Sequence, residues 1–437
     1  MHAGPSASTN KLTNLIMISL VAGIAVGYAC NRFAASPEQA KAIAGYFSIV
    51  TDIFLRMIKM IIAPLVFATI VSGIASLGAS GGAVGRIAAR SMAWFISASL
   101  ISLGLGMLFA NLFAPGRSLT LPLPSAGATT NLAASSLNLK DFITHVFPTS
   151  IVQAMATNEI LQILIFSIFF GSALAAFKNS LARNTAALID EMVHLMLRIT
   201  DFVMRFAPLG VFAAIAAVIT TQGIGVLVSY GYFIASFYLG LAVLWLVLIG
   251  AGMVVLGRPV FHLLKLLRQP MLLAFSTASS EAAFPKTLEQ LMRFGVKERI
   301  SGFVLPLGYS FNLDGSMMYQ AFAALFIAQA YGIEMSFATQ ATLLLVMMVT
   351  SKGIAGVPRA SLVVVAATLP MFDLPAGGLL LILGIDQFLD MGRTMTNVIG
   401  NGIATAAVAK WENELVPAGS EPTLAVEGTV TEQAVAA

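Results

Sequence analysis

The chain has 437 residues, of which 58% are hydrophobic and only 10% are charged, and its mean hydropathy is +0.89. Soluble domains carry about 25% charged residues, so this composition excludes an ordinary soluble protein and predicts a polytopic membrane protein. The net charge of +4 does not indicate nucleic-acid binding, and one cysteine with four scattered histidines predicts no disulfide, metal site or cofactor.

Eight apolar segments are long enough to cross the roughly 30 Å of hydrocarbon in a bilayer. They are 12–29, 44–78, 89–114, 149–177, 187–218, 224–256, 299–331 and 374–409. The first is interpreted as a retained membrane helix, because no clear small-residue cleavage site follows it. Pro64 and Pro208 are expected to kink the second and the fifth segments.

The basic residues predict how these segments are oriented. Basic clusters follow the second, fourth and sixth segments, whereas the long stretch 115–144 carries only Arg117 and Lys140. The positive-inside rule then favours eight crossings with both termini in the cytoplasm. We expect a multi-pass protein of the cell (inner) membrane, in which residues 413–437 form a disordered cytoplasmic tail.

Two segments interrupt the apolar pattern at membrane depth. They read STASSEAAFP, at 276–285, and TSKGIAGVP, at 350–358. Broken backbone at that depth is tolerated only inside protein or beside a cavity, so both are predicted to be re-entrant helical hairpins. Asn312 follows the first hairpin's proline by 27 residues, and Asp386 follows the second's by 28. Such a pair predicts inverted repeats and points to a transporter's binding site.

A polar stripe runs through the last apolar segment. Asp386, Asp390, Arg393, Asn397 and Asn401 are spaced by 4, 3, 4 and 4 residues, which puts all five on one helical face. A charged side chain at the bilayer centre costs at least about 2.5–3.5 kcal/mol, so this face is expected to line a cavity. An internal Asp390–Arg393 salt bridge is the structural alternative, but it does not account for the two amides.

The chemistry of this stripe predicts an acidic, zwitterionic ligand. Arg393 offers a planar fork for a carboxylate, and Asp390 offers a negative charge for an ammonium group. Free N–H groups at a hairpin tip suit a second carboxylate. The ligand that uses all three is aspartate or glutamate. A hydrolase built on Ser279 or Ser280 with Lys352 lacks a nucleophile elbow, so no enzyme is predicted.

The hairpin serines, the NLDG turn at 312–315, the AGVP tip at 355–358 and DMGRT at 390–394 resemble the dicarboxylate/amino acid:cation symporter family. That family includes bacterial glutamate transporters, C4-dicarboxylate transporters and mammalian excitatory amino-acid transporters. The resemblance covers nearly the whole chain and is strongest over 270–412. It implies an all-α glutamate-transporter-homologue fold with eight transmembrane helices plus two re-entrant hairpins, assembled as a homotrimer.

The resemblance also implies a division of labour within the chain. Segments 1–80 and 149–220 correspond to a fixed scaffold. Segments 81–115 and 221–412 correspond to a transport domain that moves across the bilayer like an elevator.

Individual roles are implied by motif position. Arg393 resembles the residue that binds the side-chain carboxylate, and Asp390 the residue that binds the amino group. The other implied substrate-binding residues are Ser279, Ser280, Ser316, Ile354, Ala355, Gly356, Thr394 and Asn397. The implied cation-coupling residues are Asn312, Asp314, Asp386 and Asn401.

Departures from the family pattern bear on the coupling ion. Leu313 replaces a methionine that sodium-coupled members usually carry, and Asn401 replaces their sodium-ligating aspartate. Losing an anionic ligand weakens a site for a hard cation, so proton coupling is favoured. Glu281, Asp314 and Asp386 are candidate proton carriers, because burial favours the protonated form of a carboxyl group.

Two rival functions stay open. A C4-dicarboxylate/proton symporter would leave Asp390 buried opposite two acids, which a dry site rejects. A sodium-coupled glutamate/aspartate symporter is the other rival. The predicted partners are therefore a small acidic amino acid, protons with sodium as the alternative, and the lipid bilayer, without nucleic acid.

Overall fold

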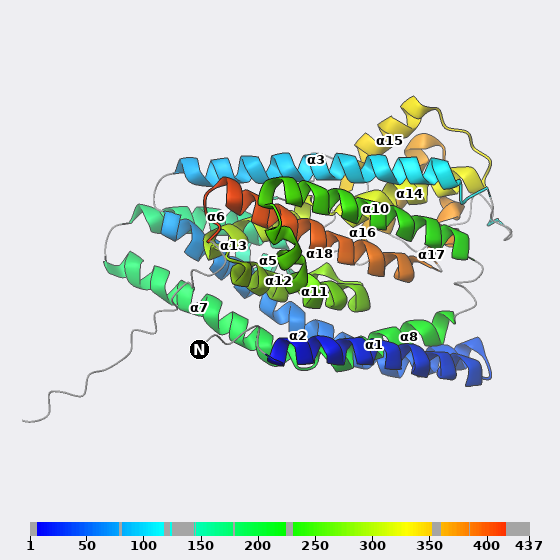
Figure 1. Ribbon diagram of the computed structural model, residues 1–437, viewed down its shortest axis with the longest axis horizontal. Helices are drawn as coiled ribbons and strands as arrows, with labels where there is room; N and C mark the ends of the chain where they lie inside the picture. The colour runs from blue at the N-terminus through cyan, green and yellow to red at the C-terminus, as the bar shows by residue number, and fades with distance from the viewer. Residues whose placement is uncertain are drawn as a thin grey trace, which may run out of the picture.

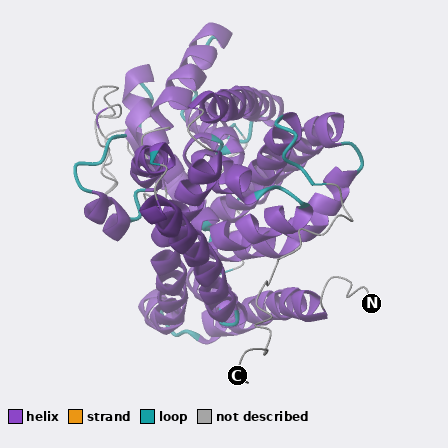
Figure 2. Cartoon of the chain, turned by 90° about the vertical axis from the view of Figure 1, so that its left-hand side faces the viewer, coloured by secondary structure: helices purple, strands orange, loops and turns teal. Residues whose placement is uncertain are grey.

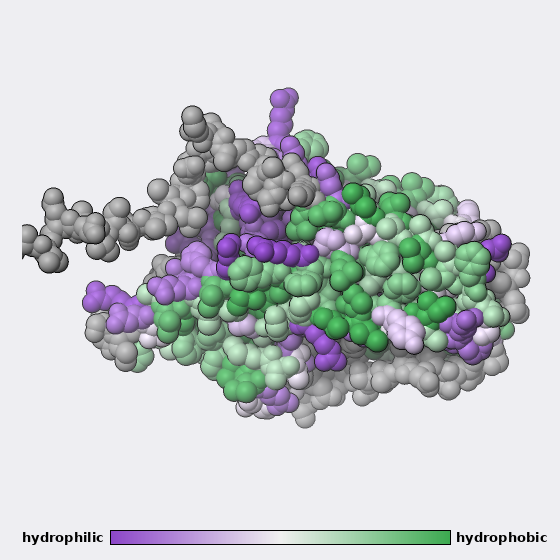
Figure 3. All heavy atoms as spheres, turned by 90° about the horizontal axis from the view of Figure 1, so that it is seen from below, coloured by the Kyte–Doolittle hydropathy of each residue, from purple (hydrophilic) through white to green (hydrophobic). Residues whose placement is uncertain are grey.

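The computed structural model describes residues 7–77, 81–117, 123–124, 144, 146–177, 180–223, 230–351, 360–383 and 385–416. These residues form helices almost throughout and contain no β-strand, which agrees with the predicted all-α class (Figure 1). Apolar side chains cover much of the face that carries α1 (Figure 3). Such a surface suits a lipid environment, because soluble monomers rarely expose large contiguous apolar patches.

Four described helices are long and apolar enough to cross a membrane by themselves. They are α1 (Ala7–Phe33), α2 (Pro37–Leu77), α3 (Gly81–Phe113) and α10 (Gly231–Leu256). A fifth candidate is the bent pair α7 (Ser180–Met204) and α8 (Ala207–Gln222), which meet at 54°. Pro208 is the second residue of α8, at this predicted break, whereas Pro64 lies inside a continuous α2.

The other predicted spans are divided into shorter helices, so the helices alone do not establish eight complete crossings. These helices are α5 (Ile151–Thr157), α6 (Ile160–Ala176), α13 (Glu298–Phe311), α14 (Asp314–Ala330), α17 (Leu379–Leu383) and α18 (Asp386–Trp411). The break between α13 and α14 falls at Asn312 and Leu313, inside the NLDG turn. Backbone groups freed at such a break must find partners from side chains or neighbouring elements.

The first predicted hairpin forms from α11 (Pro259–Thr277) and α12 (Ser280–Phe294), which pack against each other. The chain reverses at Ala278, whose φ of 48° lies in the left-handed region. Ser279 caps α12 by accepting a hydrogen bond from the Ala282 N–H at 3.2 Å. A serine at this position therefore starts the second arm of the hairpin.

The second predicted hairpin is described in its arms. They are α15 (Phe337–Thr350) and α16 (Ala360–Thr368), which pack together, followed by the short 3-10 turns η2 (Leu369–Phe372) and η3 (Ala376–Gly378). The predicted tip, with Lys352, Ile354, Ala355 and Gly356, lies outside the described residues.

Helix α18 occupies the middle of the molecule, and most of its residues are buried. It packs against α3, α10, α11, α12, α13 and α14. On the other side α2 packs against α6, α7 and α8, and α1 packs against α8. Figure 1 shows α1, α2, α7 and α8 on one side of the bundle and α3 and α10 on the opposite side, and Figure 2 shows the same helical bundle turned by 90°. The polar stripe of α18 is therefore surrounded by protein.

The chain continues past α18 as a short C-terminal strap, residues 412–416. Val416 N donates to Gly295 O at 2.8 Å, and Lys297 N donates to Glu414 O at 3.1 Å. Glu412 pairs with Arg86 at 2.8 Å, so the strap also holds the start of α3. Residues 413–416 of the expected tail are thus placed against the helices, and 417–437 lie outside the described residues.

Candidate functional site

The polar stripe of α18 is buried in the interior of the bundle. Asp386, Arg393, Asn397 and Asn401 are all buried. Asp390 is the most accessible of the five, with 17% of its side chain exposed against 2% for Arg393. Charges buried to this degree require partners, because an isolated ion in a low-dielectric interior costs several kcal/mol.

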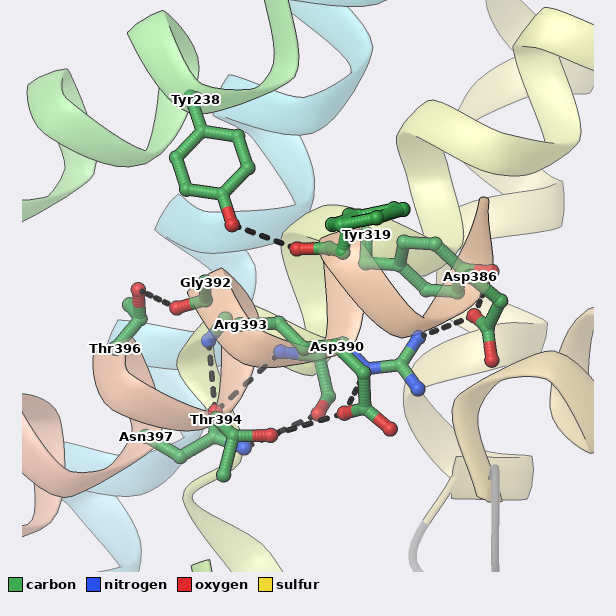
Figure 4. A network of polar contacts seen from close by, with 12 residues as sticks. Tyr238, Tyr319, Asp386, Asp390, Gly392, Arg393, Thr394, Thr396 and Asn397 are labelled. Carbon is green, nitrogen blue, oxygen red and sulfur yellow. Dashed lines mark hydrogen bonds and ion pairs between the residues drawn. The ribbon is translucent and has the colours of Figure 1, made fainter. Parts of the chain in front are cut away.

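Arg393 lies between the two carboxylates of the stripe (Figure 4). Its Nε donates to Asp390 Oδ1 at 2.7 Å, and its Nη1 donates to Asp386 Oδ1 at 3.1 Å. Thr394 donates its hydroxyl to the same oxygen of Asp390 at 2.9 Å. The salt bridge that the sequence offered as a structural alternative therefore forms, and it includes Asp386, which the sequence placed among the cation-coupling residues.

Two tyrosines from other helices complete this cluster, and sequence reasoning missed both. Tyr319 of α14 donates its hydroxyl to Asp386 at 2.8 Å, and its ring lies 4.3 Å from Arg393 Cζ. Tyr238 of α10 donates to Phe388 O at 2.6 Å, which fixes α10 against the start of α18. Tyr319 lies about one helical turn after the NLDG turn, and this proximity was the only feature of the sequence that pointed to it.

Asn397 joins α18 to the start of α14. Its Oδ1 accepts from the Gly315 N–H at 2.9 Å, and its Nδ2 donates to Ser316 Oγ at 3.1 Å. A Cβ at Gly315 would collide with the backbone of Arg393, so glycine allows the two helices this close approach. Two predicted substrate-binding residues, Ser316 and Asn397, are thereby in direct contact.

The predicted cation-coupling residues Asn312, Asp314 and Asn401 gather one turn further along α18. Asn312 Nδ2 donates to Asn401 Oδ1 at 3.3 Å. Asp314 is fully buried, and its Oδ2 packs against Gly400, where a Cβ would overlap it. Three of the four residues predicted for coupling are therefore adjacent, whereas Asp386 lies at the Arg393 end of the stripe.

The first hairpin brings its tip to the same end of α18. Ala278 packs against a cluster that contains Phe388 and Met391, and Ala274 and Ala283 of the two arms pack around Val398. Ser279 and Ser280 follow Ala278 directly at this tip. In the second hairpin, the arm that leads to the tip is α15.

The last described residue before the second tip also contacts the site helices. The Ser351 hydroxyl lies 3.6 Å from the sulfur of Met317, the residue that follows Ser316 on α14. This contact places the entry to the undescribed 352–359 segment beside the start of α14. Ser351, at the end of α15, therefore lies beside α14, which itself packs against α18.

A buried, charged network beside interrupted helices is typical of secondary transporters. A family model described as the sodium:dicarboxylate symporter family matches residues 12–411, and the chain belongs to this family. It is therefore a membrane transporter of the symporter class.

Named relatives share more than a third of their residues with the chain. A proton/sodium-glutamate symport protein of Bacillus caldotenax is 38% identical over 405 residues, covering 91% of this chain and 94% of the relative. The proton/glutamate-aspartate symporter of Escherichia coli is 37% identical, covering 91% and 92%. A C4-dicarboxylate transport protein of Rhodospirillum rubrum is also 37% identical, covering 94% and 92%. Overall identity therefore does not separate the two substrate classes.

Proposed function

We propose that the protein imports glutamate or aspartate in symport with protons across the cell inner membrane. The observation that carries this proposal is the pairing of Arg393 with Asp390. The carboxylate of Asp390 is more accessible than the guanidinium of Arg393. Arg393 presents a planar fork to a carboxylate of the substrate, and Asp390 accepts its ammonium group. A C4-dicarboxylate would meet Asp390 without a positive group to neutralise it.

The charge of the network supports cotransport. Arg393 is accompanied by three carboxyl groups, of which those of Asp314 and Asp386 are buried and that of Asp390 is partly exposed. An acidic amino acid carries a further net negative charge, so its entry into this low-dielectric site requires positive charge to enter as well. A proton that binds to one of these carboxylates provides the positive charge, and it needs no set of coordinating oxygen ligands.

Sodium is the alternative coupling ion. A sodium site needs oxygen ligands with negative charge, and the amide of Asn401 supplies none. Relatives named as proton/sodium-glutamate symport proteins have both ions in their names, so the experiment below also tests sodium coupling.

Transport by an elevator movement of a homotrimer is part of the same proposal. The helices that pack around α18, together with the second hairpin, would form the moving domain, and α1, α2, α5, α6, α7 and α8 would form the scaffold. Lys286 of α12 pairs with Asp201 of α7 at 3.5 Å, so this pair would have to break during the movement.

The test is uptake by the full-length protein in proteoliposomes, with pH and sodium gradients varied separately. Labelled glutamate and labelled succinate are compared in wild type, Asp390→Asn and the matched control Asp373→Asn. Asp373 is exposed and has a φ of 55°, a conformation that asparagine also tolerates.

We expect an inward proton gradient without sodium to drive glutamate uptake. Asp390→Asn should lower the glutamate-to-succinate ratio by about tenfold or more, since hydrogen bonds to charged groups contribute about 1.5–3 kcal/mol. Asp373→Asn should match wild type. Preference for succinate in wild type would favour the C4-dicarboxylate function, and a strict sodium requirement would contradict proton coupling.

A further inference from the structure

A groove of about 230 Å³ lies between α3 and α10, away from the polar stripe. Its walls include Trp94, Ser97 and Ile101 of α3, Val247 and Ala251 of α10, and Trp411 at the end of α18. Ile101 and Trp411 are about 40% exposed or more, so the groove opens onto the surface. Figure 1 shows α3 and α10 together on the side of the bundle opposite α1.

Positive charge lies at one end of this groove. Arg86, Arg90, Trp94 and Ile101 recur at helical spacing, so the guanidinium groups and the groove share one face of α3. Both arginines pair with the single carboxylate of Glu412, and their side chains remain 56% and 39% exposed. Two guanidinium groups against one carboxylate leave this end positively charged.

A hydrogen-bond donor lies between the charged end and the apolar groove. The ring of Trp94 packs edge-on against Trp411 with centroids 5.6 Å apart. The Trp94 Nε1 atom is buried and has no acceptor among the described residues. A buried indole N–H normally finds an acceptor, and tryptophans gather where membrane lipids present their polar groups.

We propose that this groove binds an anionic phospholipid of the membrane. Its phosphate contacts Arg86 and Arg90, an ester carbonyl accepts the hydrogen bond of Trp94, and one acyl chain lies between Ser97 and Ala251. The phosphate, the ester and the acyl chain follow one another along a phospholipid. The two arginines, Trp94 and the apolar groove follow one another in the same order along α3. The groove is smaller than the roughly 300–1,000 Å³ of pockets that enclose whole small molecules, which suits a single hydrocarbon chain.

Tryptophan fluorescence provides a direct test, because two of the three tryptophans line the groove. The third, Trp245, donates to the Thr396 hydroxyl, and Trp245→Phe is introduced in every protein to remove its signal. Full-length protein is placed in phosphatidylethanolamine vesicles. Part of the lipid is replaced by phosphatidylglycerol or phosphatidylethanolamine brominated on the acyl chains, and quenching is measured against mole fraction.

Brominated phosphatidylglycerol should quench with about fivefold higher apparent affinity than brominated phosphatidylethanolamine, the preference that one net positive charge provides near a membrane surface. Arg86→Gln should reduce this preference, whereas Lys265→Gln, an exposed lysine of α11, should not. Ala251→Phe should fill the groove and weaken quenching by both lipids. Its control Val254→Phe, one turn away and 87% exposed, should not.

Three results would overturn the proposal. Equal quenching by the two brominated lipids would show a groove without headgroup selectivity. Unchanged quenching in Ala251→Phe would place the bromine outside the groove. Absence of quenching would mean that a second copy of the chain or another protein segment covers it. The transported substrate does not enter this measurement, so its outcome is independent of the proposed function.

Discussion

The guanidinium of Arg393 lies over the ring of Tyr319, with Cζ 4.3 Å from the ring centroid. The same tyrosine donates its hydroxyl to Asp386, which also pairs with Arg393. Tyr319 therefore holds both members of an ion pair that spans two turns of α18. We infer that it positions the guanidinium for substrate without requiring contact with the substrate itself.

Tyr319→Phe keeps the ring and removes the hydroxyl. We expect the KM for glutamate to rise about tenfold or more, since a hydrogen bond to a charged group contributes about 1.5–3 kcal/mol. Tyr319→Leu also removes the cation–π contact, which contributes about 0.5–2 kcal/mol. This variant should therefore raise the KM further. Tyr331→Phe is the control, because that hydroxyl donates to Pro124 O at the far end of α14. Equal kinetics in Tyr319→Phe and wild type would contradict the positioning role.

Arg393→Lys tests the fork geometry at constant charge. A single ammonium nitrogen cannot occupy the two positions from which Nε and Nη1 reach Asp390 and Asp386. Glutamate uptake should fall by about 30-fold or more, the effect of disturbing a buried charge pair that costs about 2–5 kcal/mol. Arg293→Lys is the matched control, because that arginine is 47% exposed and pairs with Glu289 at the surface.

Protein yield and size-exclusion profiles separate misfolding from loss of function in Arg393→Lys. If the variant is folded and transports glutamate at the wild-type rate, the guanidinium does not bind the substrate's carboxylate. That result would support the purely structural salt bridge, because such a bridge can be rearranged without loss of transport.

The helical period explains how far the sequence could predict this site. The spacing from Asp386 to Asn401 placed five polar residues on one face, and the structure buries that face within the bundle. The break at Pro208 followed from proline chemistry, and the reversal near Ser279 followed from broken apolar pattern. These features depend on neighbours along the chain, which local rules describe well.

The partners across the bundle could not be predicted in the same way. Tyr319 and Asp386 are 67 residues apart, and Ser316 and Asn397 are 81 residues apart. Nothing in their local sequence specifies these pairs, because they arise from the packing of α14 on α18. The family resemblance grouped Asp386 with the coupling residues, whereas the structure pairs it with Arg393 on the same face of α18.

Asn401→Asp tests the choice of coupling ion. A carboxylate at this position would adjoin Asn312 and the buried Asp314, and it would supply the anionic oxygen that a sodium site needs. We expect wild-type uptake under a fixed pH gradient to be unchanged when sodium replaces choline. Uptake by Asn401→Asp combined with Leu313→Met should instead rise with sodium concentration. Sodium stimulation of the wild type, or none in the double variant, would contradict this account of the site.

Glu414 in the C-terminal strap predicts a pH-dependent stability. Partial burial raises the pKa of this carboxyl group, but ion pairs with Lys297, at 2.7 Å, and Arg299 lower its pKa by more. The net pKa of Glu414 is lower than the ordinary pKa of a glutamate, so the stabilisation by the strap is complete above that ordinary pKa. It is lost as the pH falls through the lower pKa of the folded state, where the carboxyl group becomes protonated.

Thermal unfolding of wild type and Glu414→Gln measures this contribution. The wild type should be more stable near pH 7 by no more than about 1 kcal/mol, because the pairs are partly exposed. The difference should shrink as the pH falls below about 4, where the wild-type carboxyl group also loses its charge. Glu334→Gln, at an exposed glutamate in the loop between α14 and α15, should show no such pH-dependent difference. A difference that grows toward low pH would mean that protonated Glu414, not its carboxylate, holds the strap against Lys297 and Arg299.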